Sequence, residues 1–205
     1  GNRTPVHLGI PGRHNVMNAL AAATVAMRYG MAPETVARIL ASQHTISPHR
    51  MALSTVNREG TSFTLIDDSF NANPDSMKAG LNGLKAWNSN DGKDPFRVAL
   101  LGAMLELGAD ETALHTSIGT YAAELGIDAI IAVGSAQDQH LDALAQALAD
   151  GARQSQSASV DCVHDIDAAE QLVIDLARNH SDAVVLLKGS HASGLSALAE
   201  RWAKN

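Results

Sequence analysis

Two neighbouring aspartates, Asp67 and Asp68, end an apolar run and are the first residues whose types and spacing suggest chemistry. Two asparagines and a proline follow them in the run Ser-Phe-Asn-Ala-Asn-Pro. A carboxylate at a strand end accepts hydrogen bonds, and the hydroxyl pair of a ribose is a natural donor. Alternatively, either aspartate can stabilise a turn, and Asn73 can cap the next helix with Pro74 at its first position. We expect the turn role for Asp67 rather than for Asp68.

A second group of polar side chains begins a predicted helix. His14 and Asn18 are four residues apart and Asn15 and Asn18 are three apart, so these side chains share one helix face. An amide offers a donor and an acceptor together, which matches the N6 and N7 edge of adenine. The helix N-terminus adds a mild positive potential. The alternative is that Asn15 only caps the helix.

Three further places carry charged or polar groups. Arg50 follows Ser-Pro-His, and its guanidinium can grip phosphate oxygens with two hydrogen bonds or can simply be solvated. His115 lies downstream of Glu106 beside an apolar helix residue, so we expect a structural histidine rather than a catalytic one. The last apolar strand ends in four residues that can hold a carboxylate or phosphate, or can form a tight turn: Lys188, Gly189, Ser190 and His191.

Hydrophobic periodicity predicts the elements that position these residues. Helices are expected at residues 13–30, 33–42, 74–87, 111–125, 138–149, 167–178 and 193–203. Strands are expected at residues 51–56, 62–66, 96–101, 129–133, 159–163 and 183–187, with a hairpin turn at 57–60. Apolar strands that alternate with amphipathic helices predict a Rossmann-like α/β fold whose mostly parallel sheet is covered on both faces.

In such a sheet, ligands bind beyond the carboxyl ends of the strands. That rule selects the loops at residues 67–73, 102–108, 134–137 and 188–193. The aspartates lie in the first of these loops and Lys188 in the last. Turn residues without periodicity at 44–49 predict a domain boundary at about residue 47. We therefore expect residues 1–47 to be the helical tail of a preceding domain and residues 48–205 to form the α/β domain.

Composition excludes several classes of protein. The net charge of −7 argues against a general nucleic-acid binder, and the single cysteine, Cys162, excludes an internal disulfide. No signal peptide or bilayer-spanning apolar run is present, so we expect a cytoplasmic protein. The sequence contains no G-x-x-x-x-G-K-[ST] loop, no G-x-G-x-x-G after a strand and no His/Cys cluster with metal spacing. Because the chain opens with glycine rather than methionine, we expect a fragment.

Taken together, the motifs resemble those of the Mur ligases along nearly the whole chain. GRHNVMNALAA at residues 12–22 resembles their GxHNxxNxxAA segment, and SPHR at 47–50 resembles the arginine-bearing hinge. DDSFNANPDSM at 67–77 looks like the DDSYNANPxSM signature of the members that add D-alanyl-D-alanine. LGAMLELG at 101–108 is similar to their G-x-M-x-E-L-G loop, which a histidine follows as His115 does here, and LLKGSHASGL at 186–195 is similar to their KGSR segment.

The resemblance implies a role for each matched residue. It implies a nucleotide site with His14, Asn15 and Asn18 at the adenine, Arg50 at the ATP phosphates, Asp68 at the ribose, and Asn71 and Asn73 on the phosphate side. It also implies that the incoming dipeptide faces Lys188, Gly189, Ser190 and His191. Two positions depart from the family pattern: Phe70 stands where tyrosine is usual, and His191 stands where arginine is usual. The second change replaces a permanent cation with a titratable one.

The implied activity is an ATP-dependent ligation in peptidoglycan precursor synthesis, with Mg²⁺ ligands and the phosphate-binding loop upstream of this chain. ATP phosphorylates the carboxylate of UDP-N-acetylmuramoyl-tripeptide, and the amine of D-alanyl-D-alanine attacks the acyl phosphate. A mobile last domain closes over the nucleotide and excludes water. We expect a monomer, and we expect this fragment alone to be inactive. Two alternatives stay open: another Mur ligase or folylpolyglutamate synthetase-type ligase, and a non-enzymatic Rossmann-like binding module.

Overall fold

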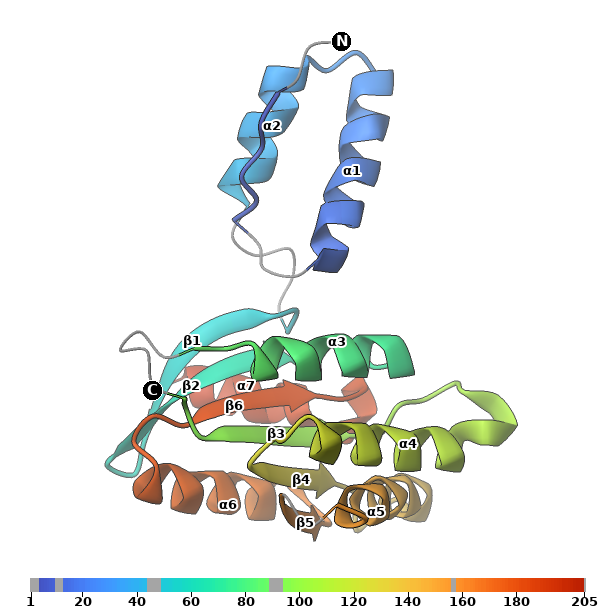
Figure 1. Cartoon of the computed structure of the whole chain (residues 1–205), viewed down its shortest axis with the longest axis vertical. Coiled ribbons are helices and arrows are strands. Elements are labelled where there is room, and N and C mark those ends of the chain that lie inside the picture. The colour runs from blue at the N-terminus through green and yellow to red at the C-terminus, as the bar shows by residue number, and fades with distance from the viewer. Residues whose placement is uncertain (1–3, 10–12, 44–48, 89–93, 156–157, 205) are drawn as a thin grey trace. The chain divides into compact units, whose positions relative to one another are not determined.

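A computed structural model describes residues 4–9, 13–43, 49–88, 94–155 and 158–204 of the chain. The chain divides into two compact units, residues 1–48 and 49–205 (Figure 1). Within the described residues, the first unit contains helices α1 (Arg13–Arg28) and α2 (Pro33–Ser42), and the second unit contains the β-sheet.

The two helices of the first unit form where the apolar periodicity predicts them. Gly30 ends α1 with a left-handed φ of 88°, and the Met31 N–H donates to the Ala26 carbonyl oxygen at 3.1 Å. Pro33 stands at the first position of α2, where its missing N–H costs nothing. The apolar side chains of this unit are nevertheless mostly exposed, among them Val16, Met17, Leu20, Val25, Met27 and Ile39.

The second unit is built on a six-stranded sheet, as counted in the described residues, with the order β1-β2-β6-β3-β4-β5. Strand β1 runs antiparallel to β2, and every other neighbouring pair is parallel. This arrangement confirms the predicted mostly parallel α/β sheet. The strands are β1 (Ala52–Arg58), β2 (Thr61–Asp68), β3 (Arg97–Gly102), β4 (Ala129–Val133), β5 (Ser159–Val163) and β6 (Val184–Lys188).

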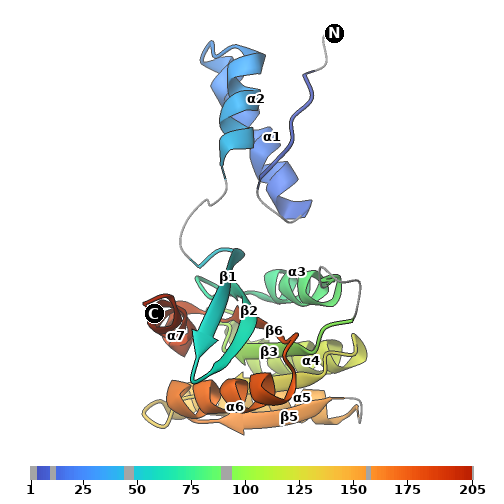
Figure 2. The same cartoon turned by 90° about the vertical axis from the view of Figure 1, so that its left-hand side faces the viewer.

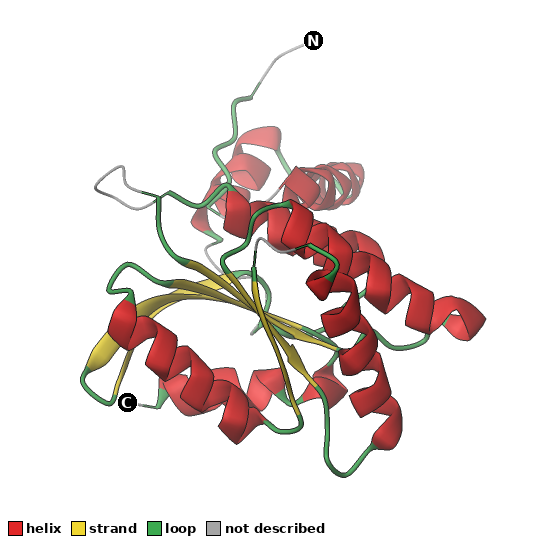
Figure 3. Cartoon of the chain, turned by 60° about the horizontal axis from the view of Figure 1, so that its bottom comes forward, coloured by secondary structure: helices red, strands yellow, loops and turns green. Residues whose placement is uncertain are grey.

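Helices cover both faces of this sheet (Figure 3). Figure 2 shows α3 and α7 on opposite sides of the β1–β2 hairpin. Successive strand residues alternate between two buried clusters: Ile66 and Leu186 pack with α3, α4 and α5, whereas Leu65 and Leu187 pack with α6 and α7. The helices are α3 (Pro74–Lys85), α4 (Glu111–Glu124), α5 (Gln139–Arg153), α6 (Ile166–Asn179) and α7 (Leu195–Ala203).

The close packing of α4 against α5 depends on one glycine in each helix. A Cβ added at Gly119 of α4 would lie 1.9 Å from the Leu148 carbonyl oxygen of α5, and one at Gly151 of α5 would lie 2.0 Å from the Thr116 carbonyl oxygen of α4. Only glycine permits this contact between the two backbones. Small side chains therefore bring α4 and α5 close together over the sheet.

Most predicted element boundaries are displaced by one to four residues in the structure, and three of these displacements change a turn or a loop. The β1–β2 hairpin turn is limited to Glu59 and Gly60, which both have positive φ (46° and 79°), as a type I′ turn requires. The last helix is interrupted by Gly194, whose φ of 76° separates the short 3₁₀ helix η2 (His191–Ser193) from α7. Strand β6 continues through Lys188, which we had expected in the following loop. Among the described residues, no helix is long and apolar enough to cross a membrane.

Candidate functional site

The site begins where β2 and β6 end side by side. Asp68 and Lys188 are register partners at the carboxyl ends of these two parallel strands. Lys188 Nζ lies 2.8 Å from Asp68 Oδ2, and it also donates to the carbonyl oxygens of Asp68 at 3.3 Å and Asn71 at 2.8 Å. The Lys188 side chain is only 2% exposed, while that of Asp68 is 18% exposed. The lysine expected at the dipeptide is thus buried and directed at Asp68.

The adjacent aspartate points to the other face of the sheet, because strand residues alternate. Asp67 Oδ1 accepts hydrogen bonds from the Ser69 N–H at 3.2 Å and the Ser69 hydroxyl at 2.6 Å. Its Oδ2 lies 2.8 Å from His49 Nδ1. Asp67 therefore takes the turn role that the sequence suggested for it. It also anchors His49, a contact that the sequence did not predict.

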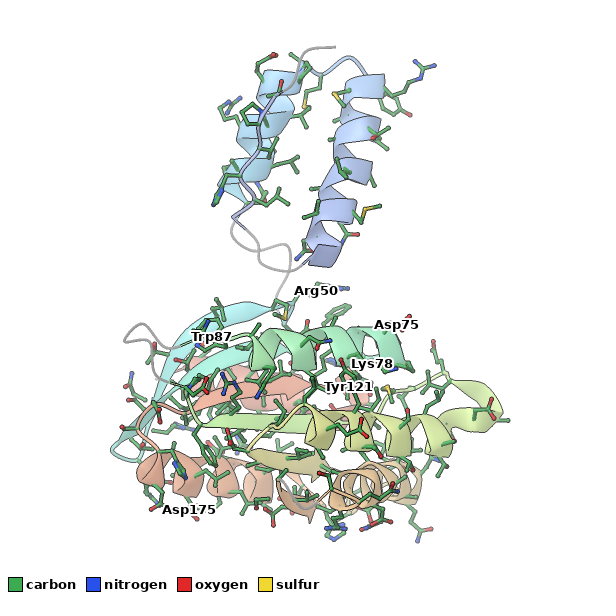
Figure 4. All side chains as sticks on the ribbon, viewed as in Figure 1. Arg50, Asp75, Lys78, Trp87, Tyr121 and Asp175 are labelled. Carbon is green, nitrogen blue, oxygen red and sulfur yellow. The ribbon has the colours of Figure 1, made fainter. Side chains whose placement is uncertain are left out.

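Arg50 lies against the loop that follows these aspartates. Its guanidinium carbon is 4.3 Å from the centroid of the Phe70 ring, and the Phe70 N–H donates to the His49 carbonyl oxygen at 3.1 Å. Both neighbours of Arg50 have left-handed backbone, with φ of 60° at His49 and 51° at Met51. The Arg50 side chain is exposed and extends outward from the sheet unit (Figure 4). The Arg50 guanidinium therefore lies over the ring of Phe70, which is two residues after Asp68 in the sequence.

The two asparagines of the same loop hold the backbone. Asn71 Oδ1 accepts from the Ala72 N–H at 2.8 Å. Asn73 Oδ1 accepts from the Ser76 N–H at 2.8 Å, and the Ser76 hydroxyl oxygen accepts from the Asn73 N–H at 3.0 Å. These reciprocal bonds form a capping box at the start of α3. The capping alternative for Asn73 is therefore present in the structure, while both side chains remain exposed.

The residues after Lys188 are packed tightly against the end of β3. A Cβ at Gly189 would lie 2.6 Å from Ser193 Oγ and 3.0 Å from Gly102 Cα, so only glycine fits there. The Ser190 N–H donates to the Ala103 carbonyl oxygen at 2.9 Å. Within the described part of the chain, the buried Ser190 Oγ has no hydrogen-bond partner. His191 is exposed, and its Nδ1 lies 3.2 Å from the Ser196 hydroxyl.

His115 supports the loop that follows β3. Its Nε2 accepts from the Met104 N–H at 2.8 Å, and its Nδ1 lies 2.7 Å from the Glu111 carbonyl oxygen, which can only accept. The ring is therefore neutral, with the proton on Nδ1. Burial lowers the pKa of His115, which favours this neutral form. The expectation of a structural histidine fits these contacts. In the same loop, Glu106 has a φ of 62°.

Comparison with known proteins identifies the family. Residues 49–191 match the family model described as Mur ligase, glutamate ligase domain. The chain belongs to the Mur ligase family. The matched segment of this Mur ligase domain includes Arg50, the two aspartates and Lys188, so the site just described lies inside it.

Similar proteins extend the match to almost the whole chain. A UDP-N-acetylmuramoyl-tripeptide–D-alanyl-D-alanine ligase from Mycobacterium tuberculosis (strain CDC 1551 / Oshkosh) is 39% identical over 201 residues, which are 95% of this chain and 39% of that protein. A crystal structure of MurF from Acinetobacter baumannii has a TM-score of 0.77 at 26% identity and covers 98% of this chain and 40% of that one. A MurF ligase from Thermotoga maritima in complex with ADP has a TM-score of 0.67 at 21% identity, covering 95% of this chain and 39% of that one. The chain thus spans about two fifths of the length of these relatives.

The first unit of this Mur ligase chain contains the predicted adenine residues. Asn18 Nδ2 donates to Asn15 Oδ1 at 3.3 Å, so the two amides do share a helix face. The side chain of His14 lies outside the described residues, although its backbone belongs to α1. A hollow of about 260 Å³ beside the two amides is lined by Leu8, Asn15, Asn18, Ala19, Ala22, Leu40 and Gln43.

No metal site emerges from the described residues of the Mur ligase chain, where no group of three or more His, Cys, Asp or Glu side chains converges. Cys162 is partly buried, and burial raises the pKa of its thiol, as in an unreactive structural cysteine. Sequence reasoning missed His49, whose role depends on Asp67, 18 residues away in the chain. The sequence contained part of the evidence for this contact, because His49 lies next to the predicted hinge and Asp67 and Asp68 follow a predicted strand.

Proposed function

We propose that this chain is part of an ATP-dependent ligase that adds D-alanyl-D-alanine to UDP-N-acetylmuramoyl-tripeptide in peptidoglycan precursor synthesis. Membership of the Mur ligase family supports this proposal, as does the 39% identity with the D-alanyl-D-alanine ligase from Mycobacterium tuberculosis. The NANP run after Asp68 narrows the choice within the family, because it resembles the signature of the D-alanyl-D-alanine-adding members.

The carboxylate of Asp68 is the single observation that carries the proposal. Its Oδ2 is held by Lys188, whereas no bond to its Oδ1 is recorded within the described residues, and the side chain is partly exposed. An oriented carboxylate with one free oxygen fits a ribose hydroxyl pair. Arg50 nearby supplies a cation for phosphate oxygens, which suits the ATP that such a ligase consumes. The ADP in the Thermotoga maritima MurF complex agrees with nucleotide binding in this family.

We propose the remaining roles as follows. His14, Asn15 and Asn18 bind the adenine, and Asn71 and Asn73 line the phosphate side. Among the described residues, the amide Nδ2 of each of these two asparagines has no hydrogen-bond partner. Gly189, Ser190 and His191 face the dipeptide. Residues 1–47 belong to the end of the central ATP-binding domain, and residues 48–205 form the last domain. The exposed apolar side chains of α1 support the first assignment, because such side chains are normally covered by further protein.

The reaction joins two substrates through an acyl phosphate. ATP phosphorylates the tripeptide carboxylate, and the dipeptide amine then displaces phosphate and forms the amide. This chain contributes orientation: Asp68 holds the ribose and Arg50 holds the phosphates, so that the terminal phosphate is directed at the tripeptide carboxylate. Mg²⁺ would neutralise phosphate charge in this reaction. Without a phosphate-binding loop, the 205-residue chain alone is expected to show no turnover as a monomer.

Steady-state kinetics on the complete ligase test this function. Activity should require D-alanyl-D-alanine, rather than D-glutamate, a diamino acid or folate. Asp68→Ala and Arg50→Ala should each lower kcat/KM for ATP by about 10- to 100-fold, since each removes a charge-assisted hydrogen bond. Two exposed residues provide matched controls, Asp175→Ala and Arg153→Ala, which should leave ATP turnover unchanged. Unchanged turnover in Asp68→Ala and Arg50→Ala would instead support a non-enzymatic binding module.

A further inference from the structure

We propose that Lys188 is a positioning residue for nucleotide binding, which holds the Asp68 carboxylate and the loop after it, and that it does not contact the dipeptide. This inference rests on the proposed function, because it assumes that Asp68 binds the ribose. It replaces the role in dipeptide binding that the sequence suggested for Lys188. It also predicts which substrate shows a changed KM when Lys188 is replaced.

The burial of Lys188 leaves its ammonium group no freedom to bind a ligand. A buried cation is unfavourable unless it is paired and fully hydrogen-bonded. Lys188 forms an ion pair with Asp68, whose Oδ2 lies 2.8 Å from Nζ, and it donates hydrogen bonds to the Asn71 carbonyl oxygen at 2.8 Å and the Asp68 carbonyl oxygen at 3.3 Å. Two of the three N–H donors of the ammonium group are therefore used in hydrogen bonds, and the carboxylate of Asp68 balances its charge. A dipeptide carboxylate could reach this group only by displacing the loop.

The path of the lysine stem is also built into the fold. Gly80 of α3 faces it, and a Cβ at Gly80 would lie 3.0 Å from Lys188 Cδ and 3.7 Å from its Cε. The glycine therefore leaves a channel between α3 and the sheet through which the stem reaches Asp68. Gly83 lies three residues further along the same helix, where an added Cβ would meet only Met51 Cε at 3.5 Å. The two glycines thus form a matched pair for testing the channel.

The contacts of Lys188 fix the direction of Asp68. The lysine binds one carboxylate oxygen together with two carbonyl oxygens of residues 68 and 71, so the start of the loop wraps around a single cation. Asp68 Oδ1 has no hydrogen-bond partner among the described residues, and the side chain is 18% exposed. Without the lysine, the carboxylate would be free to rotate and the loop carrying Phe70 and Asn71 would lose its internal support.

Kinetics on the complete ligase distinguish the two roles of Lys188. Lys188→Met keeps the length of the stem and removes the charge. We expect KM for ATP to rise by about tenfold with KM for D-alanyl-D-alanine unchanged, because the lost contact acts through Asp68. In the double variant Asp68→Asn/Lys188→Met, KM for ATP should be no higher than in Asp68→Asn alone. Thermal denaturation checks that each variant is folded.

A second pair of variants retains both charges. Gly80→Ala should raise KM for ATP, by less than Lys188→Met does, because it crowds the stem; Gly83→Ala should not. The inference is overturned if Lys188→Met raises KM for the dipeptide instead, or if it leaves KM for ATP unchanged while Asp68→Asn raises it. It is also overturned if Gly80→Ala and Gly83→Ala behave alike. If Asp68→Asn itself leaves KM for ATP unchanged, the proposed function fails first and the role of Lys188 fails with it.

Discussion

Two charged clusters lie at opposite ends of strand β2 and differ in how completely they are bonded. At the end of β2, Asp68 uses one carboxylate oxygen for Lys188, and its other oxygen has no hydrogen-bond partner within the part of the chain that the structure describes. At its start, where Arg58 pairs with Thr61, the carboxylate of Glu170 uses both oxygens. Its Oε1 accepts from Arg58 Nε at 3.3 Å and Trp202 Nε1 at 2.8 Å, and its Oε2 accepts from Arg201 Nη1 at 2.6 Å.

This difference separates a binding carboxylate from a stabilising one. Glu170 ties β1, α6 and α7 together, and its side chain is 12% exposed. Both of its oxygens are engaged, by three hydrogen bonds in all, so it has little left to offer a ligand. Asp68 is oriented but not saturated, so it can accept a further hydrogen bond. The comparison predicts that Glu170 variants change stability and that Asp68 variants change nucleotide binding.

The largest effect on stability is expected from Glu170→Ala. It removes three hydrogen bonds and leaves two arginines without their shared partner, so the free energy of unfolding should fall by about 2–3 kcal/mol. Urea denaturation of the 205-residue chain measures this fall, with the exposed Asp175→Ala as control. In the complete ligase, KM for ATP should stay unchanged. A raised KM for ATP would break the distinction between the two clusters.

A smaller effect follows from the protonation of Glu170. Burial alone would raise the pKa of Glu170, but hydrogen bonds from Arg201 and Trp202, with the charges of Arg201 and Arg58, hold it below its ordinary value. The unfolded chain therefore binds this proton first as pH falls. The resulting stability is present above pH ~4.3 and is lost as pH falls through the lowered pKa. Unfolding curves between neutral and acid pH should show this loss in the native chain and a reduced loss in Glu170→Gln.

At the other end of the sheet, the stability that His115 contributes depends on pH in a range nearer to neutral. Because burial lowers its pKa below 6.5, the unfolded chain binds the proton more readily. The stability from neutral His115 is fully present above pH ~6.5 and is lost as pH falls below it. An NMR titration of the ring, followed together with the Met104 amide that donates to it, checks this. A ring that titrates above 6.5 would contradict the buried, neutral state.

The smallest effect is expected from Phe70→Tyr, which introduces the residue usual in the family. The Phe70 ring is 44% exposed and Arg50 lies against its face, so an added hydroxyl leaves this contact in place. KM for ATP should change by less than about threefold, well below the effect expected for Asp68→Ala, because cation–π contacts at exposed sites contribute only about 0.5–1 kcal/mol. A larger decrease in KM for ATP would show that the tyrosine usual in the family makes a hydrogen bond that Phe70 cannot make.

The sequence predicted the sheet and the position of Asp68 because both depend on local patterns. Apolar strands and amphipathic helices are visible in short windows, and a carboxylate that ends such a strand lies at the ligand edge by rule. The burial of Lys188 was not predicted, since it depends on the register between β2 and β6, 120 residues apart in the chain. The Glu170 network was missed for the same reason, because its members come from β1, α6 and α7.

The most direct test of the central claim compares two nucleotides in two proteins. KM is measured for ATP and for 2′,3′-dideoxy-ATP with the native complete ligase and with Asp68→Ala. If Asp68 binds the ribose hydroxyls, the native enzyme should prefer ATP by about tenfold or more, and Asp68→Ala should show no preference. If Asp68→Ala instead weakens both nucleotides by the same factor and keeps the preference for ATP, another group binds the ribose and the account is wrong.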